Sequence, residues 1–431
     1  MGPNVFIKPI EGDMTDCIRE CFDKFGGVES ICKGNIFIKI NGTAPNTEII
    51  TNHEVVLSTI KVVNEVIKPE NIYVMDNSAV TTFTRLVFDL ENFSKRIEDL
   101  GANPLYLDEE ASINVDFKGK ALDKPIPIPK ILYKNLVENK GKNTYVNIPK
   151  LKTHVQCGVT LCIKNQHGLL YDEEKIYNHH LINDKIVDTL NVFKPDFSII
   201  DGTTAINFGP TAMDEKFIVP VGVLVSGTDF VAVDTIGAKL IGIENVKHIK
   251  MAAEKGFGCN KFEDINVIPS KDLIDRYRVP LDYKISNIPL EPHEKITIFK
   301  GKEKACITGC GAIESGAKGA DKEIKAKPCA FIFGKGHDIK KIDAYPGPFI
   351  VNGPCAISEL KSYFDNRQAR EKVKVYYIDE HMDLAQIYTY MMKAMKIKIS
   401  DILEQWPYTL PRMLELMKIA LDNGGKFKAL S

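Results

Sequence analysis

Short apolar runs rich in β-branched residues alternate in this chain with longer segments of helical periodicity. Asn35–Asn41 (NIFIKIN) alternates like a strand, and His53–Ile67 then places valine and isoleucine at helical spacing. Asn71–Met75 and Asp196–Ile200 repeat the strand pattern further along. This succession of strand-like and helix-like periodicity predicts an α/β fold built on a mostly parallel sheet with flanking helices.

The same alternation resumes after a polar, proline-containing segment, Lys271–Pro292, where we place a domain boundary. We predict two lobes: residues 1–285 form an N-terminal α/β region, and residues 293–431 form a smaller C-terminal α/β lobe ending in helices broken at Pro407 and Pro411. The ligand site is expected between the lobes, since open α/β sheets bind ligands at the carboxyl ends of strands. The elements predicted for the second lobe are strands at Ala330–Phe333, Phe349–Val351 and Val373–Ile378 and a helix at Cys355–Phe364.

The stretch Asn147–His180 concentrates the side chains that carry chemistry. It holds four of the nine histidines and two of the ten cysteines. Val159–Ile163 looks like a buried strand, and the lysine that follows it, Lys164, must find a partner, reach solvent or shift its pKa. Imidazoles, thiols and amines gathered near one sheet edge predict a metal or proton-transfer site. The histidines are His154, His167, His179 and His180.

Basic residues of this stretch are candidates for binding and catalysis. Lys150 and Lys152 could hold a carboxylate or phosphate, and the alternative is a solvated rim. Neighbouring cations would lower the pKa of His154 and leave a neutral base, whereas a structural histidine would bond a backbone carbonyl. Lys164 could equally be a structural lysine paired with Asp201 or Asp234.

Polar residues follow two of the predicted strands, where α/β proteins gather their substrate-binding groups. Asp76 and Ser78 come directly after Asn71–Met75, and they either bind a ligand or cap the next helix. The loop Thr203–Pro210 is polar and small enough for a ligand to approach closely. The residues expected to bind substrate are Asp76, Ser78, Asn207, Lys150 and Lys152.

Four cysteines of the C-terminal region match the number of ligands that a [4Fe–4S] cluster needs. Their spacing fits no common cluster motif, so a structural zinc site and four buried thiols remain alternatives. His167 and His180 are further candidate metal ligands, although His167 could instead be a turn residue. The four cysteines are Cys306, Cys310, Cys329 and Cys355.

Charge and hydropathy exclude several classes of protein. With 56 basic and 57 acidic side chains the formal net charge is −1, which argues against a general nucleic-acid or membrane surface. The sequence offers no run of about 18 or more apolar residues, and its start does not resemble a signal peptide. We expect a cytoplasmic protein, in which cysteines are thiols or ligands before they are disulfides.

The order of these motifs resembles the family called domain of unknown function 362, over roughly the first 270 residues. The resemblance implies iron–sulfur chemistry, because many members look like iron–sulfur proteins with an appended ferredoxin-type domain. This chain lacks the tight C-x2-C-x2-C run of such domains. The matching residues are Asn35–Asn41, Asp76–Ser78, Pro149–His154, Thr160–Asn165, Gly168, Asp201–Gly202, Gly209–Pro210 and Gly227–Asp234.

His154, Lys164 and His180 stand ten and sixteen positions apart, an arrangement similar to that of the nickel-pincer lactate racemase family. The resemblance implies that Lys164 tethers a pincer nucleotide, that His180 ligates nickel or another divalent metal, and that His154 exchanges a proton with the substrate. Because distant relatives can keep such positions and change the chemistry, the same residues could serve a different site.

Together these features predict a metal- or cofactor-dependent enzyme that acts on a small anionic metabolite by proton or hydride transfer, as isomerases and oxidoreductases do. The alternative is an iron–sulfur electron-transfer or cluster-handling protein with a redox partner protein. A third prediction is a binding or maturation protein that recognises a metabolite without turning it over. The residues expected to carry catalysis are His154, Lys164 and His180.

Overall fold

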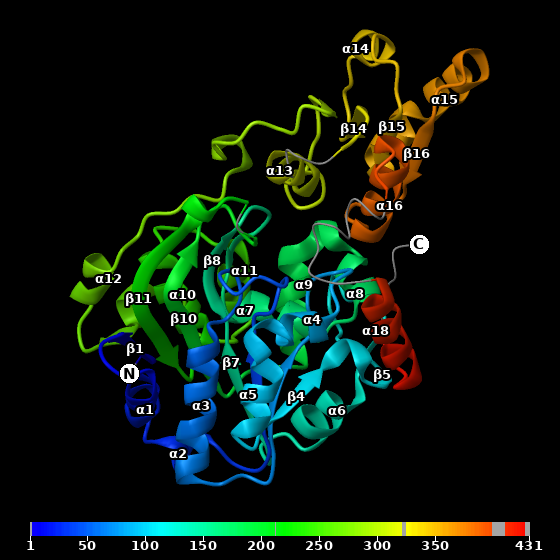
Figure 1. Cartoon of the computed structure of the whole chain (residues 1–431). Helices are drawn as coiled ribbons and strands as arrows, with labels where there is room; N and C mark the ends of the chain where they lie inside the picture. The colour runs from blue at the N-terminus through cyan, green and yellow to red at the C-terminus, as the bar shows by residue number, and fades with distance from the viewer. Residues whose placement is uncertain (1, 212, 321–324, 399–409, 427–431) are drawn as a thin grey trace.

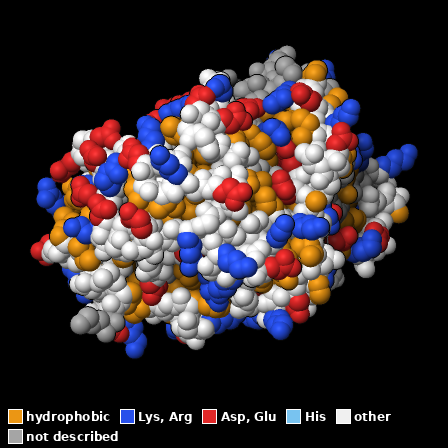
Figure 2. All heavy atoms as spheres, turned by 90° about the horizontal axis from the view of Figure 1, so that it is seen from below, with side chains coloured by type: hydrophobic (Ala, Val, Ile, Leu, Met, Phe, Trp, Pro, Cys, Tyr) orange, Lys and Arg blue, Asp and Glu red, His pale blue; other side chains and the backbone are white. Residues whose placement is uncertain are grey.

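The computed structural model of this chain describes residues 2–211, 213–320, 325–398 and 410–426. Within these residues, two main sheets with flanking helices form two lobes, which confirms the predicted α/β class (Figure 1). No helix of the described segments is long and apolar enough to span a bilayer. Figure 2 shows acidic and basic side chains interspersed over the face seen from below, as expected for a net charge near zero.

The larger sheet runs through the N-terminal lobe. Its described strands are β1 (Asn4–Pro9), β2 (Ile36–Ile40), β3 (Ile72–Asp76), β4 (Asn103–Tyr106), β7 (Thr144–Ile148), β8 (Lys150–His154), β9 (Gly158–Thr160), β10 (Phe197–Ile206), β11 (Ile218–Gly227) and β12 (Asn266–Ile268). Their order is β12-β1-β11-β10-β7-β2-β3-β4, with β8 joined to β10 and β9 joined to β8. Strands β2, β3, β4, β7 and β10 run parallel, so their carboxyl ends share one edge.

Helices cover both faces of this sheet. Ile36 and Ile38 of β2 pack with α1, α3 and α5 on one face, whereas Phe37 joins a separate apolar cluster. Because side chains alternate along a strand, Lys39 shares the face of Phe37. The elements around the sheet are α1 (Met14–Asp23), α2 (Val28–Ile31), α3 (His53–Val66), α4 (Thr84–Phe88), α5 (Phe93–Asp99), β5 (Ser112–Val115), β6 (Ile126–Pro129), α6 (Lys130–Leu132), α7 (Cys162–Asn165), α8 (Asp172–Ile176), α9 (Ile182–Asp188), α10 (Phe230–Leu240), α11 (Lys247–Glu254) and α12 (Asp272–Arg276).

The second sheet is parallel throughout and has the order β13-β14-β15-β16. It forms the core of the smaller lobe drawn in yellow and orange in Figure 1. The first helix after β15 runs to Glu371, well past the predicted end at Phe364. The elements of this lobe are β13 (Ile296–Lys300), α13 (Gly311–Gly319), β14 (Cys329–Phe333), α14 (Ile339–Asp343), β15 (Phe349–Asn352), α15 (Gly353–Glu371), β16 (Val375–Ile378) and α16 (Leu384–Met395).

The last described helix, α18 (Leu410–Asp422), returns to the N-terminal lobe (Figure 1). Its Leu416 packs with Phe83 and Leu86, and Arg412 Nη2 lies 3.2 Å from Asp89 Oδ2. Helix α18 therefore packs on the first lobe, whereas the predicted second lobe includes all of residues 293–431. The predicted break at Pro407 lies outside the described residues.

The predicted strand Val159–Ile163 is wrong as a single element. Strand β9 ends at Thr160, and the short helix α7 begins at Cys162. Asp234 of α10 causes this change, because its carboxylate accepts from Cys162 N at 2.6 Å and from Ile163 N at 2.9 Å. A fully buried aspartate thus holds the start of the turn that carries Lys164. Strand β10 also differs, since it continues to Ile206 through residues predicted as a loop.

Replacing Asp234 with Asn should destabilise the protein by about 2 kcal/mol, because Asp234 accepts from two buried backbone N–H groups and the new amide would turn an N–H toward one of these donors. Urea denaturation followed by circular dichroism measures this loss. The matched control is Asp13→Asn at the exposed N-cap of α1, where Asp13 accepts from Thr15 N at 2.7 Å. Asn and Asp cap helices about equally well, so the control should cost under about 0.5 kcal/mol; equal losses in both variants would contradict this account.

Candidate functional site

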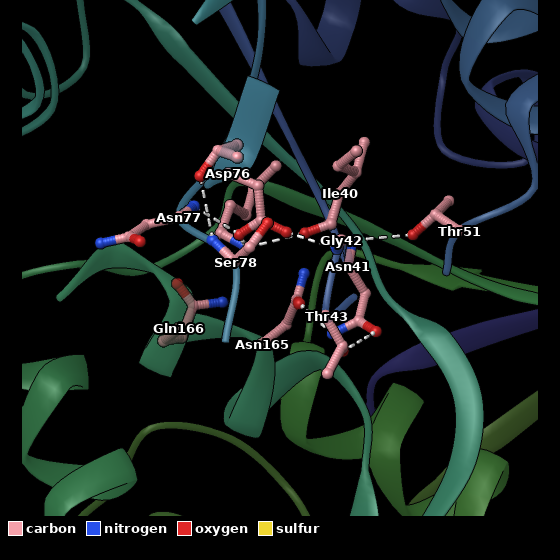
Figure 3. A network of polar contacts seen from close by, with 12 residues as sticks. Ile40, Asn41, Gly42, Thr43, Thr51, Asp76, Asn77, Ser78, Asn165 and Gln166 are labelled. Atoms are coloured by element: carbon pink, nitrogen blue, oxygen red, sulfur yellow. Dashed lines mark hydrogen bonds and ion pairs between the residues drawn. The ribbon is translucent and has the colours of Figure 1, made fainter. Parts of the chain in front are cut away.

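The carboxyl ends of β2 and β3 meet at a buried ion pair. Asp76 accepts from Lys39 Nζ at 2.6 Å and from Asn77 N at 2.7 Å, and Gly42 N donates to its other oxygen (Figure 3). A Cβ on Gly168 would lie 2.7 Å from Asp76 Oδ1 and 2.7 Å from Lys39 Nζ, so only glycine fits there. Asp76 was predicted to bind substrate. Its oxygens are instead occupied by donors of the protein, and its role here is to order the strand ends.

A chain of amide side chains continues from this ion pair to α7. Asn41 Nδ2 donates to Asn165 Oδ1 at 3.1 Å, and Asn165 Nδ2 donates to Asn147 Oδ1 at 2.8 Å. Thr43 Oγ1 donates to Asn41 Oδ1 at 3.0 Å (Figure 3). The turn around Lys164 is therefore held by β2 and β7 on one side and by α10 on the other.

Strand β8 carries basic side chains on one face. Lys152 is fully buried, and its Nζ donates to Thr43 Oγ1 at 2.9 Å and to the backbone oxygen of Ile49 at 3.1 Å. Both acceptors are neutral, so neither compensates the charge of this amine. Burial, followed by the positive charges of Lys164 and Lys150, lowers the pKa of Lys152 well below its usual value.

The side chain of Lys150 makes different contacts from that of Lys152. Its Nζ lies 3.1 Å from Asp201 Oδ2 and donates to Thr203 Oγ1 at 3.0 Å. It borders a cavity of about 230 Å³ beside the N-terminus of α3, and this cavity does not reach His154 or Lys164. The predicted pairing of Lys150 with Lys152 around one anion is not seen. The cavity is lined by Thr47, Glu48, Asn52, His53, Glu54, Glu91, Arg96, Lys150, Thr203 and Thr204.

Lys164 is a partly exposed amine within a largely buried stretch. Its Nζ makes no hydrogen bond or ion pair with any residue that the structure describes. Burial lowers the pKa of Lys164; Cys157 opposes this shift and Lys175 adds to it. His167 and Gly168 are also partly exposed as residues, although the His167 Nε2 is buried.

His154 lies in the field of Lys164. The ring is 4% exposed, and the backbone N–H of Gln156 donates to its Nδ1 at 3.2 Å. Burial first, and Lys164 second, lower the pKa of His154 well below its usual value, so the ring is neutral. Because Nδ1 accepts a hydrogen bond, the proton of the neutral ring lies on Nε2. His154 was predicted to be a base, yet it presents a proton donor in this arrangement.

Several amines in this region lack a carboxylate partner among the described residues. Lys152 and Lys164 are two of them, and Lys185 is a third. The Nζ of Lys185 donates to the backbone oxygens of Glu174 and Lys175, both at 2.9 Å, and burial lowers the pKa of Lys185 to about 7. By contrast, Lys39 and Lys150 each have a buried counter-ion, in Asp76 at 2.6 Å and in Asp201 at 3.1 Å. The region around Lys164 is thus richer in cationic groups than in carboxylates.

The side chain of His180 lies apart from those of His154 and Lys164. Its ring centroid is 4.5 Å from that of His381 in the second lobe, and Thr308 Oγ1 donates to the His180 backbone oxygen at 2.8 Å. Its electrostatic neighbours are His381, Cys306, Glu380 and Lys185, and neither His154 nor Lys164 is among them. The structure therefore brings His154 and Lys164 together and leaves His180 at the junction with the second lobe. His167 stays near Lys164, and its buried Nε2 has no hydrogen-bond partner among the described residues.

The four C-terminal cysteines do not converge. Cys306 Sγ and Cys310 Sγ are 3.9 Å apart, and Cys355 follows the carboxyl end of β15 on the same edge of the sheet. Cys329 opens β14 at the opposite edge, about 13 Å away along the strand. The Cys310 thiol, followed by the His381 ring, lowers the pKa of Cys306 to about 3. No group of three or more His, Cys, Asp or Glu side chains in the described segments is arranged to hold a metal. A [4Fe–4S] cluster on these positions stays a prediction, with Cys329 poorly placed to join it.

The remaining predicted substrate contacts separate as well. Ser78 is 2% exposed, its backbone oxygen accepts from Lys175 Nζ, and its Oγ lacks a partner among the described residues. Asn207 Oδ1 accepts from Asp282 N at 2.7 Å, so this side chain fastens the connection to the second lobe. Ser78 therefore lies beside Lys175, whereas Asn207 lies at the connection to the second lobe.

The fold and the site can now be compared with known proteins. Residues 36–239 match the family described as "Domain of unknown function (DUF362)". This part of the chain is similar to that domain. A curated relative, "Thylakoid-associated protein sll1697" of Synechocystis sp. (strain ATCC 27184 / PCC 6803 / Kazusa), is 26% identical over 265 residues, which cover 58% of this chain and 76% of the relative. The predicted resemblance to this family is confirmed over residues 36–239, whereas neither comparison indicates the lactate racemase family.

The DUF362-like region, residues 36–239, contains buried cations that sequence reasoning missed. Lys39 interrupts the apolar run of β2, which is a readable signal, because a lysine inside a buried strand needs a partner. Lys175 and Lys185 look like ordinary surface lysines of short helices in the sequence. Their burial depends on the packing of α8 against α9, and no local sequence pattern predicts it. His248, which follows this region in α11, was missed for the same reason.

His248 gives a pH dependence that can be measured. The ring is fully buried, and burial followed by Lys164 lowers the pKa of His248 from 6.5 to about 3. The unfolded chain binds a proton below pH 6.5 and the folded chain does not, so stability is lost as pH falls through this window. Stability should fall by about 1.4 kcal/mol per pH unit from this ring alone.

Urea denaturation of the wild-type protein should show this loss of stability between about pH 6.5 and pH 5. In His248→Gln the loss over the same pH range should be smaller by about 2 kcal/mol. Gln keeps a polar group near Asn183 Oδ1, which lies 3.4 Å from the His248 Nδ1. Parallel pH profiles for the two proteins would contradict the assignment.

Proposed function

We propose that the DUF362-like region binds a small anionic metabolite at Lys164 and acts on it by proton transfer through His154. The observation that carries the proposal is the Lys164 amine, partly exposed and without any described partner, among other amines that lack carboxylates. Burying uncompensated positive charge is costly, and a bound anion removes that cost. A carboxylate or phosphate group is the ligand chemistry that such a site would select.

The chain's own residues support each role. Lys164 would contact the anion directly, and the negative charge of the bound anion would favour the protonated form of the buried Lys152. His154 would donate the Nε2 proton to an atom that gains negative charge and take it back in the reverse step. Low dielectric strengthens both interactions, since the surrounding stretch is largely buried. Reactions of the isomerase or oxidoreductase kind fit this arrangement.

A pincer nucleotide with nickel does not fit these residues as the resemblance implied. His180, the expected metal ligand, faces His381 and Cys306 and not Lys164. The proposed proton transfer therefore does not depend on that cofactor. A cytoplasmic location belongs to the same proposal, because all ten cysteines are free thiols.

Proton transfer can be tested by hydrogen exchange. The protein is incubated in D2O with a panel of 2-hydroxy, 2-oxo and phosphorylated carboxylates, and NMR follows deuterium entering carbon positions. One class of anion should exchange with the wild-type protein, and His154→Gln should slow this by about 10²–10⁴-fold, since Gln cannot move a proton. His337→Gln in the second lobe is the control and should exchange normally. Exchange that survives in His154→Gln would overturn the role of His154.

A further inference from the structure

The loop between β13 and α13 brings two cysteines into contact. Cys306 Sγ and Cys310 Sγ are 3.9 Å apart. A tight turn causes this approach, because Cys310 N and Gly311 N both donate to the Cys306 backbone oxygen, at 3.0 and 3.2 Å. Cys310 is buried just before α13, whereas Cys306 is partly exposed. One accessible and one buried sulfur at this spacing is the arrangement of a dithiol that can close to a disulfide.

A histidine from the second lobe faces the accessible sulfur. A Cβ built on Gly309 would lie 3.1 Å from Cys306 Sγ and 3.1 Å from His381 Nδ1. Both atoms therefore occupy the space that a side chain at position 309 would take. The absence of that side chain lets an imidazole approach Cys306, where it can exchange a proton with a sulfur that gains or loses a bond.

The surroundings favour thiol chemistry over metal binding. Among the described residues, no set of three or more potential ligands could hold a metal at this point, whereas two sulfurs are in contact. Closing the pair to a disulfide requires the sulfur atoms to approach by about 2 Å, which rotation of the two cysteine side chains can supply. Ile307, which is 58% exposed, sits beside Cys306 and offers an apolar contact for a polypeptide.

We propose that Cys306 and Cys310 form a redox-active dithiol that exchanges with a disulfide of a partner polypeptide. The Cys306 sulfur attacks one sulfur of the partner disulfide, forms a mixed disulfide and releases one partner thiol. Cys310 gives up its proton and attacks the Cys306 sulfur, which forms the Cys306–Cys310 disulfide and releases the second partner thiol. Two electrons pass from this chain to the partner, and each step reverses when the partner is the dithiol.

The test uses the full chain with glutathione disulfide as the probe, followed by alkylation and peptide mapping. We expect one internal disulfide, between Cys306 and Cys310. Cys310→Ser should instead trap glutathione on Cys306, at least about tenfold more than on Cys259, a partly exposed cysteine that serves as the internal control. Lys164→Met should leave both results unchanged, which separates this activity from the proposed anion site.

Two results would overturn the dithiol. Equal labelling of Cys306 and Cys259 in Cys310→Ser, with no internal disulfide in the wild-type protein, would show ordinary thiols. Stable incorporation of iron and sulfide that is lost in Cys306→Ser would show that these sulfurs hold a cluster.

Discussion

A Lys164→Met variant should be more stable than the wild-type protein in the absence of anions and should gain nothing from their addition. The substitution removes an amine that no described residue compensates and keeps most of its apolar stem. We expect the free energy of unfolding to rise by about 1–2 kcal/mol, because an unpaired amine on a partly buried residue is destabilising. In the wild-type protein, an anion at about 100 times its dissociation constant should add about 2.7 kcal/mol.

Thermal denaturation with phosphate, citrate and lactate measures both effects at constant ionic strength. The matched control is Lys250→Met on α11, where Lys250 is exposed and lies 3.8 Å from Glu254. This control should respond to anions as the wild-type protein does. If Lys164→Met kept the full anion response, the anion would bind elsewhere, and the cavity beside Lys150 would become the site to examine.

Asp76→Asn is the second substitution for which we expect a large effect. It leaves Lys39, which is 1% exposed, without its only close carboxylate, and it weakens the bond from Gly42 N. Breaking a buried ion pair from one side costs about 3–5 kcal/mol, since the remaining charge stays buried. Urea denaturation should therefore show a large fall in the midpoint with little change in the slope.

A double substitution separates the loss of the ion pair from other effects of the Asp76 substitution on the strand ends. Lys39→Met combined with Asp76→Asn removes both charges, so the pair should be more stable than Asp76→Asn alone by at least about 1 kcal/mol. Asp99→Asn, which removes the partner of Lys95 on the exposed surface of α5, should cost no more than about 1 kcal/mol. A double variant that is as unstable as the sum of its singles would argue that Asp76 acts only through its backbone donors.

The strands of both lobes could be predicted because their apolar alternation is local. Asn35–Asn41 and Asn71–Met75 appear as β2 and β3 within a residue of their predicted ends. Capping is local as well: Asp229 directly precedes α10 and accepts from Val231 N and Ala232 N. The helix at Lys164 could not be predicted, because its cap comes from Asp234, about seventy residues later in the chain.

The site was predicted in part. Lys152, His154 and Lys164 share one electrostatic neighbourhood, as the basic composition of the stretch indicated. Lys150 lies on the same strand face, but Asp201 and Thr203 draw it toward another cavity. His180 could not be placed from the sequence, because its neighbours His381 and Thr308 come from the second lobe, more than a hundred residues later in the chain. Contacts between distant segments, more than local patterns, decide which basic residues meet.

The most direct test of the anion site is a crystal structure of the wild-type protein grown or soaked with selenate, whose selenium atom is located by its anomalous signal. The account predicts a selenium peak beside Lys164, with selenate oxygens about 2.7–3.2 Å from Lys164 Nζ and His154 Nε2. Selenate bound only at Lys150, or a Lys164 amine that stays without an anion at saturating selenate, would contradict it.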